Sequence, residues 1–208
     1  MSQFFESIKW QDGEFYLLDL HQKRVDRTMQ QHFPNAEKID LKSVLNVPNG
    51  IKTGLFKVKV IYDYELISVS FDAYKVKKHK QVKLVENDTI IYAFKSTIRA
   101  DLEKPMYGNV DFDDVIFVKN GLLSDASYSN IVFFDDQKWY TPKECLFEGV
   151  KRKSLLNSGK IEEKSIKVDD LKLFSKIAFV NAMRDFEYMY DFELNGNQLY
   201  LKESTCDI

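Results

Sequence analysis

The chain has 208 residues, of which 44% are hydrophobic and 14% aromatic, a composition that fits a folded protein with a buried core and excludes a disordered one. Its 30 Lys and Arg residues are balanced by 32 Asp and Glu residues, and the net charge is only -2. A protein without an excess of positive charge is not expected to have nucleic acid as its main partner.

The sequence contains neither the Cys and His spacing typical of a metal site nor an apolar segment typical of a membrane anchor. The two cysteines and three histidines are not spaced like metal ligands, so we expect no metal site. The first ten residues carry charged side chains within their apolar stretch, and no later run is long enough to cross a bilayer. We therefore expect a cytoplasmic protein with no membrane partner. The cysteines and histidines are Cys145, Cys206, His21, His32 and His79.

The first part of the chain predicts a mixed lobe of strands and helices. Residues 4–10 and 14–18 alternate like two strands of a hairpin, with Asp12-Gly13 as the turn. Helical spacing follows from Asp19, the expected N-cap, and ends at Phe33-Pro34. Further on we predict a short helix at 40–45 and strands at 55–62 and 66–71.

Lysines gather between residues 75 and 83, on both sides of His79. We interpret this basic segment as a solvated strand face or a linker, in preference to a site for a polyanion. The pattern of the chain changes near this segment. We therefore predict an N-terminal α+β lobe at 1–85 and a C-terminal lobe at 86–208.

The second lobe is predicted to be rich in strands, because its apolar runs are short and frequent and turn signals separate them. A helix is expected after Gly149, closed by Gly159, and a second helix after Val168. Strands are expected at 90–94, 115–118, 131–134, 139–140 and 177–180.

Several motifs stand in an order that resembles one family. FFESIK and LDLHQKRVDRT lie near the N-terminus, FKSTIR contains Lys95 and Arg99, and AFVNAMRDF lies near the other end. From about residue 4 to about residue 186 the chain resembles the class IV aminotransferases and aminodeoxychorismate lyases. The segment from Lys119, KNGLLSDASYSNIVFFDDQKWYTPKECLFEGVKRKSLL, carries most of the resemblance, through Gly121, Asp125, Asn130, Thr141-Pro142 and Gly149.

The resemblance implies the two-lobe α+β architecture of pyridoxal-phosphate fold type IV, like aminodeoxychorismate lyase and D-amino acid aminotransferase, with pyridoxal 5'-phosphate between the lobes. Lys95 matches the family's Schiff-base lysine. A lysine that is partly buried at the end of an apolar strand would have a pKa below its usual value of about 10.4. This favours the neutral amine, which is the nucleophile. Without the resemblance, a surface lysine at a strand end is the simpler interpretation.

Asp125 stands where the family carries a glutamate that keeps the cofactor's pyridine nitrogen protonated. Aspartate is one methylene shorter, so this contact requires a closer approach or a bridging water. A turn-capping role for Asp125 is the alternative.

The cofactor phosphate is expected to meet three parts of the chain. Arg24 matches an arginine of the family's first helix and can hold phosphate oxygens bidentately, although an ion pair on the helix surface with Asp19 or Asp26 is equally compatible with the sequence. The other two parts are the N-terminus of the helix that opens with Val150 and Lys151, and a turn at Asn181 and Ala182.

The resemblance implies an enzyme that acts on a small carboxylate substrate as a homodimer. The FVNAM segment favours a lyase that converts 4-amino-4-deoxychorismate to 4-aminobenzoate and pyruvate in folate biosynthesis. An aminotransferase acting on an amino acid and a 2-oxo acid is the alternative, because both reactions use one site. A non-catalytic relative is a third hypothesis, motivated by the aspartate at 125 and the short chain.

Overall fold

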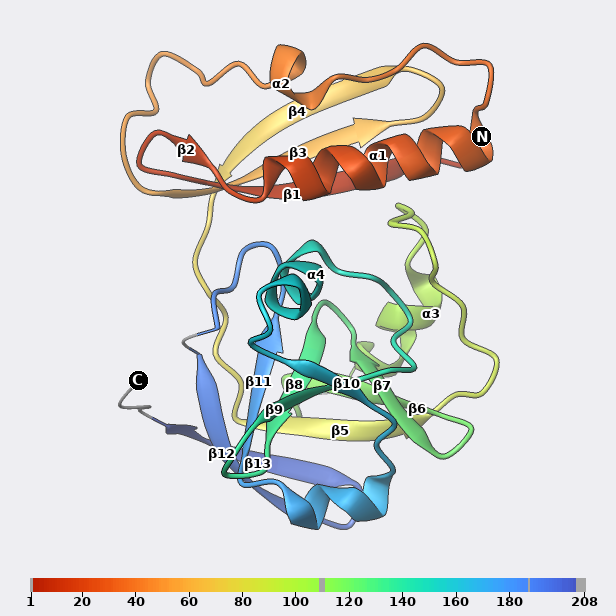
Figure 1. Ribbon diagram of the computed structural model, residues 1–208, viewed down its shortest axis with the longest axis vertical. Coiled ribbons are helices and arrows are strands. Elements are labelled where there is room, and N and C mark those ends of the chain that lie inside the picture. Colours follow the sequence, from red (N-terminus) through yellow and green to blue (C-terminus); the bar gives the residue numbers. More distant parts are fainter. Residues whose placement is uncertain (1, 109–110, 187, 205–208) are drawn as a thin grey trace. The chain divides into compact units, whose positions relative to one another are not determined.

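The structure is a computed structural model that describes residues 2–108, 111–186 and 188–204 (Figure 1). The chain forms two compact units. The small unit consists of Met1–Val76 and Phe94–Ile98, and the large unit of Lys77–Ala93 and Arg99–Ile208. This division differs from the predicted one at residue 85, because the strand at 81–86 pairs with strands of the large unit, and because a short segment around Lys95 returns to the small unit.

The small unit is a four-stranded antiparallel sheet of order β2-β1-β3-β4 with helix α1 packed against it (Figure 1). The predicted elements are all present, with two differences at the start. The second strand is only two residues long, and α1 begins after Leu17, whose left-handed backbone (φ 55°) makes it the N-cap in place of Asp19. The elements are β1 Phe4–Gln11, β2 Glu14–Phe15, α1 Leu18–His32, α2 Leu41–Val44, β3 Leu55–Tyr62 and β4 Leu66–Ala73.

Two periodicities bring polar side chains into the core of the small unit. In β1 the alternation of a strand places Glu6 on the same buried face as Phe4 and Ile8. In α1 the spacing of a helix turns one stripe of residues toward that face. The stripe is partly polar, so the carboxylate of Glu6 meets ionisable partners inside an apolar core. The buried residues of α1 are His21, Arg24, Val25, Thr28 and Met29.

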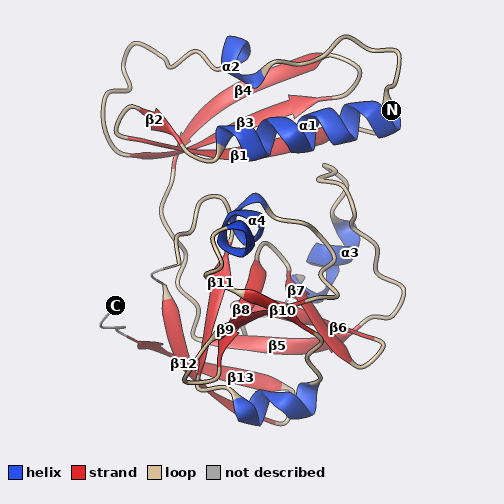
Figure 2. Cartoon of the chain, in the orientation of Figure 1, coloured by secondary structure: helices blue, strands red, loops and turns tan. Residues whose placement is uncertain are grey.

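The large unit is built mainly from strands (Figure 2). Its nine-stranded sheet has the order β10-β9-β8-β11-β12-β13-β5-β6-β7. Since β7 and β8 are far apart in this order but only three residues apart in the chain, the sheet must curl until its two ends approach each other. The strands are β5 Gln81–Glu86, β6 Asp114–Lys119, β7 Leu122–Ala126, β8 Asn130–Phe134, β9 Trp139–Pro142, β10 Glu162–Lys164, β11 Lys176–Val180, β12 Met189–Asn195 and β13 Gln198–Ser204.

The helices of the large unit are short. The predicted helix after Gly149 is confirmed as α4, and the one after Val168 is a 3-10 helix. Most of the curled sheet's apolar side chains form one core, to which β5, β6, β8 and β11 all contribute. The helical elements are α3 Ala100–Glu103, η1 Lys104–Met106, α4 Val150–Asn157 and η2 Val168–Leu173.

The strand predicted at 90–94 is wrong. Ile90 and Tyr92 are buried in a small apolar cluster, whereas Ile91 is 78% exposed, and residues 90–94 form no strand. A short apolar run in the sequence does not distinguish a strand from an extended loop in which alternate residues are buried. Whether such a run forms a strand depends on backbone pairing with a neighbouring segment, which the local pattern does not contain.

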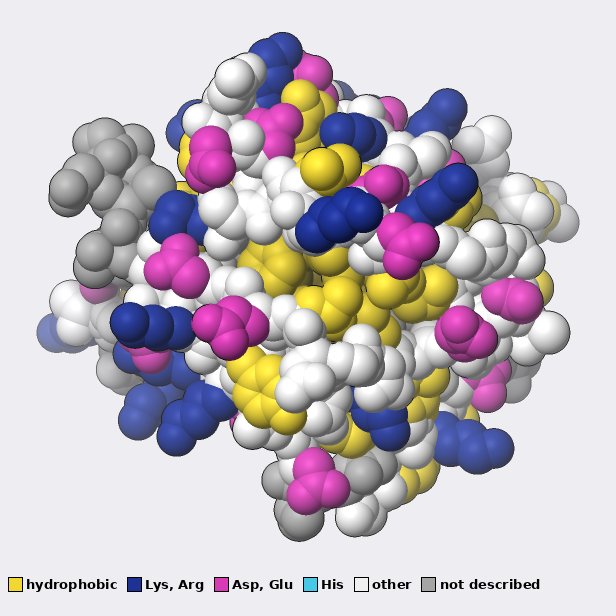
Figure 3. Space-filling view, turned by 90° about the horizontal axis from the view of Figure 1, so that it is seen from below, with side chains coloured by type: hydrophobic (Ala, Val, Ile, Leu, Met, Phe, Trp, Pro, Cys, Tyr) yellow, Lys and Arg dark blue, Asp and Glu magenta, His cyan; other side chains and the backbone are white. Residues whose placement is uncertain are grey.

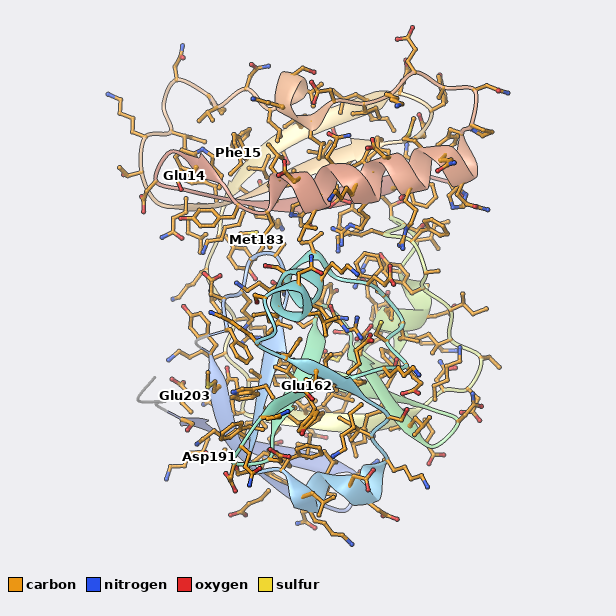
Figure 4. The ribbon with its side chains drawn as sticks, viewed as in Figure 1. Glu14, Phe15, Glu162, Met183, Asp191 and Glu203 are labelled. Carbon is orange, nitrogen blue, oxygen red and sulfur yellow. The ribbon has the colours of Figure 1, made fainter. Side chains whose placement is uncertain are left out.

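The surface of the large unit mixes charges of both signs. An exposed ion pair joins Lys138 to Glu162, and half-buried Lys176 pairs with exposed Asp191, both at 2.7 Å (Figure 4). The face shown in Figure 3 likewise has Lys, Arg, Asp and Glu side chains interspersed around a central apolar area. Among the described residues, no helix combines the length and the apolar character needed to span a bilayer.

The lysine-rich segment is only partly the solvated stretch that its composition suggests. Lys78 is exposed and pairs with Glu203 at 2.7 Å. Its neighbour His79, however, is only 6% exposed and packs into the large unit. Tertiary contacts from residues more than 100 positions away bury this histidine, and the local sequence gives no sign of them.

Candidate functional site

The small unit holds a buried cluster of three ionisable side chains. The carboxylate of Glu6 accepts hydrogen bonds from Arg24 Nε at 2.8 Å and Arg24 Nη2 at 2.5 Å, and His21 Nδ1 lies 2.5 Å from the same carboxylate. Glu6 and His21 are fully buried, and Arg24 is nearly so. The expected alternative of a surface ion pair between Arg24 and Asp19 or Asp26 is therefore wrong, because the helix turns Arg24 inward to Glu6.

The electrostatics of this cluster determine which groups are charged. Burial alone would raise the pKa of Glu6, but the charge and hydrogen bonds of Arg24, aided by His21, outweigh it and hold the pKa at about 2. Burial lowers the pKa of His21, and the positive charges of Arg24 and Lys95 lower it further against the opposing effect of Glu6. The cluster at neutral pH therefore contains an anionic Glu6, a cationic Arg24 and a neutral His21.

The tautomer of His21 follows from its partner. An ionised carboxylate can only accept, so Nδ1 carries the proton and donates to Glu6. Nε2 is then an acceptor, and it is buried without a hydrogen-bond partner among the described residues. A buried acceptor in this state is unusual in a folded protein, and a functional role is one explanation for it.

Lys95 belongs to the small unit and acts on the same cluster. Its backbone oxygen accepts a hydrogen bond from Phe5 N at 2.9 Å, and its Nζ lies 4.7 Å from the centre of the Phe5 ring. The side chain is half-buried, and its charge lowers the pKa of His21. The structure thus brings Lys95, Arg24, His21 and Glu6 together, although Lys95 is held by a loop and not by the strand that the sequence suggested.

In the large unit Asp125 is a buried acceptor on β7. Its Oδ1 accepts from Asn130 Nδ2 at 2.7 Å, and its Oδ2 accepts from Phe147 N at 2.9 Å. Burial raises the pKa of Asp125 to about 6, against the lowering effect of these hydrogen bonds and of the Arg152 charge. Asp125 is therefore not a local turn cap, since it links β7 to the segment in front of α4, and its charge changes near neutral pH.

The N-terminus of α4 lies beside the same carboxylate. Gly149, the N-cap, has no side-chain cap, and a Cβ atom built on it would lie 2.1 Å from Asn130 Oδ1. Only glycine fits at this position, because Asn130 is itself held by Asp125 and by the Phe147 oxygen at 2.8 Å. The first N–H groups of a helix have no acceptor within the helix, so this end of α4 offers backbone donors for an anion.

The predicted residues near α4 are linked to one another. Lys151 Nζ pairs with Asp185 at 2.9 Å, next to the turn at residues 181–184 (Figure 4 labels Met183 of this turn). In that turn, Asn181 donates through Nδ2 to the Tyr128 oxygen at 3.2 Å and to Ser129 Oγ at 3.0 Å. The structure therefore brings together Asp125, Val150, Lys151, Asn181 and Ala182 in the large unit, and Lys95 and Arg24 in the small one.

Some buried polar residues were given no role by the sequence. Glu6 and His21 lie in motifs that carry the resemblance, and the period of β1 and the helical spacing from His21 to Arg24 would have placed them on one buried face. For three further residues no local signal exists, because their partners lie far away in the chain. These are His79, Asp114 and Arg184.

Comparison with known proteins identifies the family. The Amino-transferase class IV family model matches residues 101–186. A Haemophilus influenzae (strain Rd) protein of uncharacterised function is 30% identical over 185 residues, which cover 88% of this chain and 98% of the relative. The chain belongs to the class IV aminotransferase and aminodeoxychorismate lyase family of pyridoxal phosphate-dependent enzymes.

Solved structures agree with this assignment and confirm the expected α+β fold. A Haemophilus somnus 129PT protein, for which a 4-amino-4-deoxychorismate lyase activity has been suggested, has a TM-score of 0.81 at 25% identity, covering 88% of this chain and 97% of that one. A hypothetical aminotransferase from Mycobacterium tuberculosis with bound PLP has a TM-score of 0.72 at 15% identity, covering 87% and 78%. At that identity the second comparison shows the fold alone.

The buried cluster around Glu6 predicts a pH-dependent loss of stability. Glu6→Gln should lower the free energy of unfolding by about 3 kcal/mol at pH 7, because it removes an anion that neutralises buried Arg24. The folded-state pKa is depressed from 4.5 to about 2, so this stabilisation is present above pH 4.5 and lost as the pH falls through 2. Urea unfolding of both proteins between pH 2.5 and 7 should show their difference shrinking toward low pH.

A matched control is Glu14→Gln, at an exposed position on β2 of the same unit (Figure 4). It should change the free energy of unfolding by less than about 0.5 kcal/mol. An equal loss in both variants, or a Glu6 effect that does not depend on pH, would contradict the charge assignment.

Proposed function

We propose that this chain binds pyridoxal 5'-phosphate and converts 4-amino-4-deoxychorismate to 4-aminobenzoate and pyruvate. The observation that supports this reaction most strongly is the similarity to the Haemophilus somnus protein. The two chains match over nearly their full lengths, with a TM-score of 0.81. A chain of this length is therefore compatible with a lyase.

The residues of the small unit fit the reactive end of the cofactor. Bound pyridoxal phosphate supplies an aldehyde carbon that bonds to amines and a protonated ring that accepts electrons from a substrate carbon. Lys95 provides the amine that holds this carbon when no substrate is bound. The unpaired Nε2 of His21 gives the buried cluster an acceptor beside this lysine, and Glu6 fixes the guanidinium of Arg24 as a cation for the phosphate.

The residues of the large unit fit the ring nitrogen and the phosphate. Asp125, whose pKa is about 6, offers a carboxylate that is mostly ionised at neutral pH and holds a proton on the ring nitrogen. Gly149 keeps the start of α4 open, because any side chain there would collide with Asn130. The backbone N–H groups of Val150 and Lys151 and the Asn181–Ala182 turn then supply donors to phosphate oxygens.

In the proposed reaction Lys95 moves the proton. Its Nζ would remove the proton from the amine-bearing carbon of the substrate ring while the substrate amine is held by the cofactor, and Lys95 would take the place of that amine again when 4-aminobenzoate leaves. The enolpyruvyl group then leaves with the electron pair of its carbon–oxygen bond and becomes pyruvate after protonation, while the ring becomes aromatic. This sequence requires one substrate and one proton carrier, and no second substrate has to bind.

The test is a single-turnover reaction with purified protein, pyridoxal phosphate and 4-amino-4-deoxychorismate, without any 2-oxo acid. We expect 4-aminobenzoate and pyruvate in equal amounts. The alternative reaction, transamination, predicts that common amino acids convert the bound cofactor to pyridoxamine phosphate while no aromatic product forms. A protein that binds the cofactor but gives neither result would be a non-catalytic member of the family.

A further inference from the structure

A second group of buried polar side chains lies in the large unit, apart from Asp125. His79 comes from the lysine-rich segment, Asp114 is the first residue of β6, and Arg184 ends the 181–184 turn. They are 6%, 3% and 3% exposed, respectively. Buried ionisable groups are costly to a fold unless they are paired, so their arrangement requires an explanation.

Arg184 fixes the orientation of the His79 ring. Its Nη1 lies 3.0 Å from His79 Nδ1, and its Nη2 donates to the Lys77 oxygen at 2.7 Å and to Tyr190 OH at 3.0 Å. A guanidinium can only donate, so Nδ1 accepts and the ring proton is on Nε2. Nε2 faces Asp114 Oδ2 at 3.5 Å, and the ring packs on Phe179 with centroids 4.6 Å apart.

Asp114 connects His79 to the turn between β7 and β8. Its Oδ1 accepts hydrogen bonds from the hydroxyl and from the backbone N–H of Ser127, the first residue of that turn. The next residues of the turn, Tyr128 and Ser129, accept from Asn181. The 127–129 turn and the 181–184 turn are thus joined twice, directly through Asn181 and indirectly through Asp114, His79 and Arg184.

We propose that His79 is a positioning residue that, through Arg184 and Asp114, fixes the 181–184 turn for phosphate binding. This inference rests on the proposed function, in which Asn181 and Ala182 contact the cofactor phosphate. Backbone donors bind an anion well only when they are already aligned, since ordering them during binding costs free energy. The hydrogen bonds of the Arg184 guanidinium to the Lys77 oxygen and to Tyr190 OH, together with its contact to His79, hold the end of the turn.

Three variants test separately the contacts of His79 with Arg184 and with Asp114. His79→Phe keeps an aromatic ring against Phe179 but removes both nitrogen atoms. His79→Asn keeps an acceptor near the position of Nδ1 and loses the link to Asp114. Lys78→Ala, at the neighbouring exposed position, is the matched control.

The first measurement is amide hydrogen exchange in the protein without cofactor. The amides of Met183 and Arg184 both donate to Asn181, at 2.9 Å and 3.1 Å, and report on the turn. In His79→Phe their exchange should be about tenfold faster, corresponding to about 1.4 kcal/mol, which is near the lower end for a hydrogen bond to a charged group. Lys78→Ala should leave it unchanged, and His79→Asn should restore at least part of the protection.

The second measurement compares pyridoxal phosphate with pyridoxal, which lacks the phosphate. For His79→Phe we expect the Kd of pyridoxal phosphate to rise about tenfold, with the Kd of pyridoxal unchanged. An equal weakening of both ligands, or unchanged exchange at Met183 and Arg184, overturns the proposal. So does an equal increase in exchange throughout the large unit, because it indicates a general loss of stability.

These measurements also distinguish the two levels of inference. If the unmodified protein binds no pyridoxal phosphate, the proposed function fails. The exchange experiment needs no cofactor and still decides whether His79 holds the turn.

Discussion

Replacing Lys95 with alanine is expected to abolish turnover, with a loss on the order of 10^4-fold or more. The lysine is the proposed covalent partner of the cofactor and the proposed carrier of the substrate proton, and its charge acts on the neighbouring His21. The product assay with 4-amino-4-deoxychorismate measures the loss. Lys95→Arg should be equally inactive, because it restores the charge but not a neutral amine.

The chain offers a matched control for this substitution. Lys59 also places its Nζ over the Phe5 ring, at 5.6 Å from the ring centre compared with 4.7 Å for Lys95. Lys59→Ala removes an ammonium from the same ring and should leave turnover within about twofold. Borohydride reduction followed by peptide mapping should place the phosphopyridoxyl label on Lys95. A label on Lys59, or an active Lys95→Ala variant, would refute the assignment.

Asp125→Asn is expected to lower turnover by about 10^2- to 10^3-fold while cofactor content changes little. The substitution nearly keeps the shape of the side chain but removes the negative charge that, in the proposed function, keeps the ring nitrogen protonated. The other contacts proposed for the cofactor, at α4 and at Asn181, would be unchanged. Turnover is measured with the product assay, and cofactor content by absorbance after purification.

Part of any effect at Asp125 is structural, because an amide cannot accept from both Asn130 and Phe147 N as the carboxylate does. Unfolding measurements must therefore accompany the assay. Asp191→Asn, which changes an exposed carboxylate paired with Lys176, is the matched control and should be nearly neutral for both properties. Unchanged turnover in Asp125→Asn would mean that this residue only ties the segment around Phe147 to β7.

Local sequence was sufficient for most elements of the small unit. Alternation at 55–62 and helical spacing after Asp19 are set by nearby residues, and the structure has β3 and α1 at these places. The same is true of α4, because the glycines that mark its start and its end, Gly149 and Gly159, are close to it in the sequence. The order of the motifs around Lys95, Asp125 and Gly149 could also be recognised in the sequence, and it indicated the family.

The sequence by itself thus determined the fold class, the family and the positions of the matching motifs, because each depends on short-range periodicity or on the order of a few residues. The tertiary structure alone decided which groups meet. Glu6 and Arg24 pair across 18 positions, and His79 and Arg184 across 105. It also made residues 90–94 a loop and not a strand. Such contacts depend on how distant segments pack, and free energies of burial and pairing that involve distant residues leave no trace in a local pattern.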